Sequence, residues 1–152
     1  MAIALVLHLL AAVVWVGGMF FAYMVLHPVA AGTLEAPQRL TLWARVFSRF
    51  FPWVWFVVIS LLLTGYPLLF GVFGSMGNAP IYVHLMQAMG LIMMAIFAHV
   101  FFAPFQRLKR AVAAEDWEAG GRQLAQIRRM VGINLTLGLM VVVMAGGGRL
   151  MM

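Results

Sequence analysis

Cysteine is absent from this chain of 152 residues, and charged side chains make up only 9% of it. The lack of thiols excludes disulfides, thiolate metal sites, iron–sulfur clusters and covalent haem attachment through cysteine. The scarcity of charge excludes an ordinary soluble domain, in which about 25% of the residues are charged. Apolar side chains dominate instead, at 65% of the residues, with a mean hydropathy of +1.03. This composition indicates an integral membrane protein.

The positions of the few charges divide the chain into four predicted membrane spans. Apart from Arg149, every charged residue lies within residues 35–49 or 107–129. A helix needs about 20 apolar residues to cross the hydrocarbon core, and the uncharged stretches supply them. Glycine and proline break the longest stretch into two spans. We expect an all-α, four-helix bundle forming a single transmembrane domain, 1–152, with spans over about 2–27, 53–73, 81–104 and 130–148.

Two basic segments between the spans predict the orientation in the membrane. Of the ten Lys and Arg residues, three lie between the first two spans and six between the last two. The positive-inside rule places both segments in the cytoplasm and both termini outside, in the periplasm of a bacterial-type inner membrane. Helical spacing of apolar residues predicts an interfacial helix over about 38–50, and 105–129 is expected to be a cytoplasmic loop. The net charge of +6 is then explained by topology and anionic lipids, without nucleic acid.

All four histidines lie in the apolar spans, where an ionisable side chain is expected to have a function. The first and third spans run in the same direction, so that His8 and His84 fall at similar depth near the outer side. His27 and His99 form a second pair near the inner side. Two imidazoles on facing helices are typical ligands of haem b. The pattern predicts haem b between His8 and His84, and at His27 and His99 either a second haem or only polar helix ends.

The thirteen methionines favour a rival interpretation, because imidazole and thioether ligands together suit Cu(I). Met19 lies on the same helical face as His8, at about 100° per residue. Three further methionines form a stripe on the third span, roughly opposite His84: Met86, Met89 and Met93. Packing or lipid contact also explains this stripe, since methionine is a general gap-filler.

Three more residues are candidates for a cofactor site. Trp15 lies on the His8 face of the first span. Asn134 opens the fourth span and is placed to bond an inner ligand, or simply to join two helices. Arg149, at the outer end of that span, either meets a haem propionate or anchors the helix among lipid headgroups.

Two segments resemble a known family. The segment from His8 to Gly18, HLLAAVVWVGG, resembles the first helix of the copper-resistance D (CopD) superfamily. It also resembles the first helix of the related HemJ-type protoporphyrinogen oxidases. The fourth helix of small members is similar to the segment RRMVGINLTLG, from Arg128 to Gly138. The resemblance implies a four-helix membrane protein that binds haem b, with His8 matching the first-helix histidine of the HemJ type. CopD-like proteins are associated with copper uptake.

HemJ-type proteins also have an important lysine on the third helix, at the position that Met86 occupies here. This difference argues against protoporphyrinogen oxidase activity. We expect a haem b-binding redox protein, acting in electron transfer or a haem-dependent oxidation, with the lipid bilayer, a quinone or other redox partner, and a second copy of the chain as partners. The alternatives are a CopD-type copper transporter with His and Met ligands, and a structural subunit that needs no site.

Overall fold

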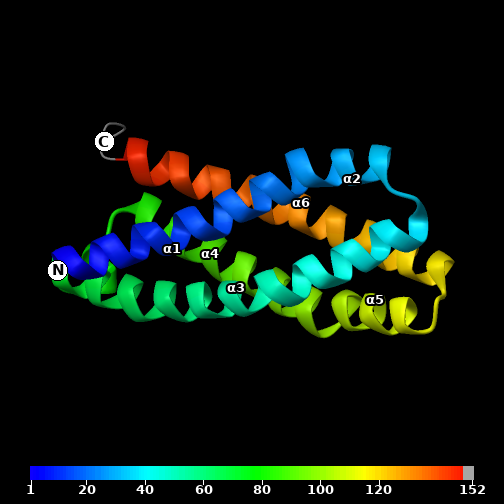
Figure 1. The fold of residues 1–152 in the computed structure, drawn as a ribbon. Coiled ribbons are helices and arrows are strands. Elements are labelled where there is room, and N and C mark those ends of the chain that lie inside the picture. The colour runs from blue at the N-terminus through cyan, green and yellow to red at the C-terminus, as the bar shows by residue number, and fades with distance from the viewer. Residues whose placement is uncertain (149–152) are drawn as a thin grey trace.

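The computed structural model describes residues 1–148, and within that range it contains helices and no strands. This confirms the all-α prediction. The helices are joined into four long rods that run side by side along an elongated bundle (Figure 1). In chain order they are α1 (Ala2–Phe20), the π-helix η1 (Phe21–Leu26) and α2 (His27–Thr33), then α3 (Ala36–Phe73), the 3₁₀ turn η2 (Met76–Asn78), α4 (Ile81–Phe102), α5 (Pro104–Ala113) and α6 (Trp117–Gly147).

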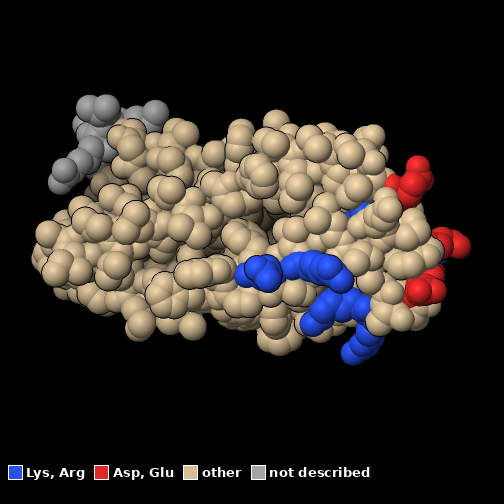
Figure 2. Space-filling model, in the orientation of Figure 1, with Lys and Arg blue, Asp and Glu red and all other residues tan. Residues whose placement is uncertain are grey.

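Each rod is long and apolar enough to cross a membrane, which agrees with the predicted number of spans. Helix α1 packs against α3 and α6, while α4 packs against α6 and continues into α5. The N-terminus of α1, the turn η2 and the C-terminal end of α6 lie together at one end of the bundle (Figure 1). The charged side chains on the displayed face gather toward the opposite end (Figure 2). One end of the bundle is therefore polar and the other apolar.

The first rod is longer than the predicted span 2–27, because it continues through Pro28 as far as Thr33. Proline normally disrupts a helix, since its ring meets the carbonyl group four residues earlier. Here the π-helix η1 immediately precedes it, and the N–H of His27 bonds to the carbonyl of Ala22 five residues back. This wider turn lets the helix pass the proline, and it rotates the following residues away from the positions expected for a regular α-helix.

The predicted interfacial helix 38–50 is not a separate element. It is continuous with the next span in α3, which passes through Pro52 and ends at Gly74, where φ is +74°. The apolar side chains that suggested contact with the bilayer, Leu40, Trp43 and Phe47, are buried inside the protein. They are covered because α5 and α6 pack over this part of α3.

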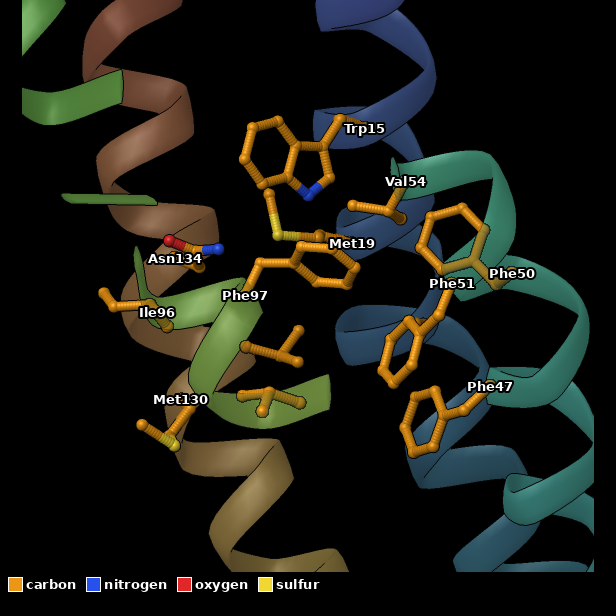
Figure 3. Close-up of a pocket in the computed structure, with 13 residues that line it drawn as sticks. Trp15, Met19, Phe47, Phe50, Phe51, Val54, Ile96, Phe97, Met130 and Asn134 are labelled. Carbon is orange, nitrogen blue, oxygen red and sulfur yellow. The ribbon is translucent and has the colours of Figure 1, made fainter. Parts of the chain in front are cut away.

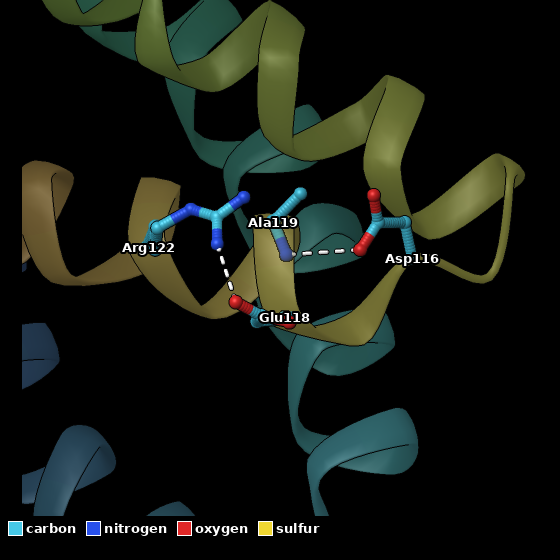
Figure 4. A network of polar contacts seen from close by, with 4 residues as sticks. All are labelled: Asp116, Glu118, Ala119 and Arg122. Atoms are coloured by element: carbon cyan, nitrogen blue, oxygen red, sulfur yellow. Dashed lines mark hydrogen bonds and ion pairs between the residues drawn. The ribbon is translucent and has the colours of Figure 1, made fainter.

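The segment between the third and fourth predicted spans, 105–129, is a helical hairpin. Helix α5 and the start of α6 are joined by a short turn in which Glu115 has a φ of +53°. Asp116 caps α6, since its Oδ1 accepts a hydrogen bond of 3.0 Å from the N–H of Ala119. One turn further, Arg122 donates to Glu118 at 2.7 Å (Figure 4). These charges are exposed, so the hairpin lies at the polar end of the bundle.

Aromatic rings fill the interior of the bundle toward its polar end. The ring of Phe51 stacks on Phe47 at 4.9 Å between centroids and meets the edges of Phe97 at 5.4 Å and Phe105 at 4.8 Å. Aromatic pairs in these geometries stabilise a core by about 0.5–1.5 kcal/mol beyond their area burial. This half of the bundle is therefore densely packed.

Adjacent glycines in α1 provide a test of this packing. A side chain at Gly18 would collide with the ring of Phe50 and lie 2.7 Å from its Cε2, whereas nothing lies within 4 Å of a side chain at Gly17. We expect Gly18→Leu to lower the free energy of unfolding in detergent micelles by about 1–3 kcal/mol, as overpacking does. Gly17→Leu should change it little, and equal effects of the two substitutions would contradict the α1–α3 contact.

Candidate functional site

A cavity of about 700 Å³ lies inside the apolar end of the bundle. It forms because α1 packs on α3 and α4 packs on α6, whereas α3 and α4 diverge beyond the turn that joins them. None of the Lys, Arg, Asp or Glu residues within 1–148 lines it. A cavity of this size with apolar walls and a few polar groups is typical of a ligand-binding site. The residues that carry its chemistry are His8, Tyr66, Tyr82, Met86, Gln87, Met93 and Met94.

His8 is held against α3 by a hydrogen bond between side chains. Its Nδ1 lies 2.8 Å from the hydroxyl oxygen of Thr64, which is buried. The imidazole ring also covers Gly65, where an added Cβ would lie 3.1 Å from its Cε1. A glycine beside the threonine therefore allows α1 to approach α3 closely enough for the hydrogen bond to form.

The hydrogen bonds of Thr64 determine which ring nitrogen of His8 carries the proton. The Thr64 hydroxyl has a single proton, and it donates this proton to the carbonyl oxygen of Ser60 at 2.6 Å. With its proton given to Ser60, the oxygen accepts from His8, and we assign the hydrogen to Nδ1 on this basis. In the neutral imidazole the lone pair is then on Nε2. Metal-binding histidines are commonly oriented in this way, with one ring N–H bonded to a fixed acceptor and the other nitrogen free to coordinate.

Thr64 bonds back to its own helix, as hydroxyl side chains within a helix commonly do. Its second role as the partner of His8 was missed, because it depends on how α1 and α3 pack. Another missed pair is Gln87 and Tyr66. The Gln87 Nε2 donates to the Tyr66 hydroxyl at 3.1 Å, which joins α4 to α3 across the cavity wall. The sequence signal for this pair was Gln87, a single amide side chain within an apolar stretch.

Three methionines of α4 line the cavity: Met86, Met93 and Met94. Met86 and Met93 belong to the stripe that the sequence placed opposite His84. His84 is half-buried and lies outside the cavity lining found for residues 1–148. The rotation of α4 thus presents thioethers, not an imidazole, to the cavity that contains His8. The predicted pairing of His8 with His84 at one haem stays a prediction, and the cavity itself supplies one imidazole.

The inner histidines lie on different helices, α2 and α4. His27 is half-buried, and its ring is 6.0 Å from that of Trp43 on α3. His99 is exposed near the end of α4. Within residues 1–148 no group of three or more His, Asp or Glu side chains is close enough to hold a metal ion. Arg149 lies outside the described residues, so its predicted roles stay predictions.

A second, small cavity of about 30 Å³ lies deeper in the bundle (Figure 3). Trp15 lines both cavities and so lies between them, and Met19 lines the small one. Asn134 also lines the small cavity and is buried. Its Nδ2 donates to the carbonyl oxygen of Met93 at 3.2 Å, while its Oδ1 has no partner among the described residues. Asn134 therefore joins α6 to α4, and joining two helices is one of the two roles predicted for it.

The fold and the cavity together define a class: a multi-pass membrane protein whose internal site contains one imidazole and several thioethers and is lined by no Lys, Arg, Asp or Glu of residues 1–148. Comparison with protein families assigns it more closely. The sequence profile described as copper resistance protein D, CopD, matches residues 44–147. This match covers more than half of the chain, so the protein belongs to the CopD family, and the predicted membership is confirmed. No curated protein and no solved structure matches the chain.

Replacing Thr64 by Val tests the proposed orientation of His8, because valine keeps the shape and removes the acceptor. In the wild type, ¹⁵N NMR of His8 should show a protonated Nδ1 and an unprotonated Nε2. In Thr64→Val this preference should be lost. Thr136→Val is a matched control, since Thr136 bonds only to the carbonyl of Gly132 in its own helix. An Nε2–H tautomer in the wild type would contradict the assignment.

Proposed function

We propose that this CopD-family protein is a membrane copper protein that binds Cu(I) in the large cavity. The observation that carries the proposal is the set of donors on the cavity wall. His8 lines the cavity together with Met86, Met93 and Met94, the tautomer assigned above leaves the lone pair on its Nε2, and no carboxylate of the described chain lines the cavity. Soft thioethers with imidazole select Cu(I) over the harder divalent metals.

The charge of the ion supports the same choice. Moving an ion from water into an apolar interior costs energy that grows with the square of its charge, so a divalent ion costs about four times as much as a monovalent one. The cavity offers no charged side chain of residues 1–148 to offset this cost. Neutral donors without a counter-charge are therefore better suited to Cu(I) than to Cu(II) or Zn²⁺.

A second candidate occupant is haem b, which the volume of the cavity favours. One copper ion needs far less than about 700 Å³. His8 could supply one axial ligand and Met86 the other, a His/Met pair as in cytochromes c. Haem also brings two propionates, and no Lys or Arg of the described chain lines the cavity to meet them. The donors therefore fit copper better than haem.

Copper titration of the purified protein distinguishes these functions. We expect tight Cu(I) binding in competition with a colorimetric chelator, weakened at least about tenfold by His8→Ala or Met86→Leu, since each removes a ligand. Two control substitutions should leave the affinity unchanged. Met89→Leu alters a neighbouring methionine outside the described cavity lining, and His99→Ala alters an exposed histidine.

Two outcomes would overturn the copper proposal. One is the absence of Cu(I) binding by the wild type. The other is a reduced-minus-oxidised absorption spectrum of haem b that disappears in His8→Ala, because this result would assign the cavity to haem.

We also propose that both termini face the periplasm, with the charged hairpin in the cytoplasm and the protein in the inner membrane. Nine of the ten Lys and Arg residues lie in the two connecting segments, and the positive-inside rule assigns these to the cytoplasm. The cavity would then open toward the periplasmic side. A reporter fused after Met152 that is active only in the periplasm should be active. Activity of a reporter that functions only in the cytoplasm would reverse the orientation.

A further inference from the structure

A buried methionine lines each of the two cavities. Met93 lines the large cavity and Met19 lines the small one. Each side chain is only 4% exposed, although both belong to helices with lipid-facing surfaces. The two residues are on different helices, α4 and α1, so packing of the bundle has brought them together.

Gly138 on α6 is the place where they meet. A Cβ at this position would lie 3.1 Å from the Met93 Cε and 3.7 Å from the Met19 Cε. The methyl groups of both methionines therefore lie over the same glycine. The distance between the two methyl carbons cannot exceed the sum of these two distances. A larger residue at 138 would occupy the space that lets them meet.

A second observation at the same place concerns Asn134, one helical turn before Gly138. It is 4% exposed, and its Nδ2 holds the carbonyl group of Met93 at 3.2 Å. Its Oδ1 is buried without a partner among residues 1–148, although such atoms are usually satisfied. The site therefore combines two buried methionines with an amide that is bonded to the backbone carbonyl of one of them and whose oxygen has no partner among the described residues.

We propose that Met19 and Met93 form a second binding position for Cu(I), through which the ion leaves the large cavity and enters the small one. This inference rests on the proposed copper function. The ion remains Cu(I) throughout, and thioether ligands exchange without gain or loss of a proton. Methionine has three rotatable bonds, so each sulfur can turn toward the ion without moving the backbone.

Weak, sequential sites are suited to conduction, because an ion must bind well enough to enter and loosely enough to leave. A pair of thioethers without thiolate or carboxylate meets this requirement. Trp15 lines both cavities beside this pair and packs edge-on against Phe97 at 6.3 Å between ring centroids. Passage between the cavities therefore requires the Trp15 indole to move aside.

The test is Cu(I) flux into proteoliposomes containing the full chain and a luminal copper-sensitive dye, measured beside equilibrium Cu(I) binding. Met19→Leu conserves volume and removes the sulfur. Because Met19 lies outside the described lining of the large cavity, binding there should stay within about twofold of wild type while flux falls at least about tenfold. Met140→Leu is the control, since Met140 is 45% exposed and lines neither described cavity.

Met19→Cys provides a second readout that a packing role would not change. A buried thiol at this position gives a stronger Cu(I) ligand, so the variant should retain one more copper ion per chain than the wild type. Wild-type flux in Met19→Leu, or no additional copper in Met19→Cys, would overturn the transfer site while leaving the large-cavity function intact. Absence of Cu(I) binding by the wild type would instead overturn both.

Discussion

The hydroxyl group of Thr64 has one proton to donate, and the chemistry of the cavity depends on where that proton goes. It is directed to the carbonyl of Ser60, so the oxygen accepts from His8. The imidazole is thereby held against α3 with its other nitrogen free. In an apolar bundle an unmatched donor would cost about 1–3 kcal/mol. The hydrogen bond thus joins α1 to α3 and fixes the orientation of the imidazole.

The two halves of the bundle are packed differently. Toward the polar end, stacked aromatic rings such as Phe47 and Phe51 fill the interior, and the charged hairpin of α5 and α6 covers it. Toward the apolar end, α3 and α4 diverge and leave a cavity whose walls are held by hydrogen bonds between helices, including Gln87 to Tyr66. The packed half gives the rigidity that lets the open half keep its shape.

The sequence predicted the all-α fold and four helices able to span a membrane, because the pattern of charge and hydropathy along the chain needs no tertiary contacts. It could not predict the partner of His8. Helix 81–104 offered two opposite faces, one with His84 and one with Met86 and Met93, and only packing selects between them. The bond from Asn134 to the carbonyl of Met93 fixes that choice. The π-helix before His27 was also beyond prediction, because it changes the helical phase without a clear sequence signal.

X-ray absorption spectroscopy of the copper-loaded protein tests the central claim most directly, since it reports the oxidation state and the ligand atoms together. The account predicts Cu(I) with sulfur and nitrogen in its first coordination shell, because the cavity brings His8 together with methionine thioethers. Copper bound only by nitrogen and oxygen, or Cu(II) that persists under reducing conditions, would contradict it.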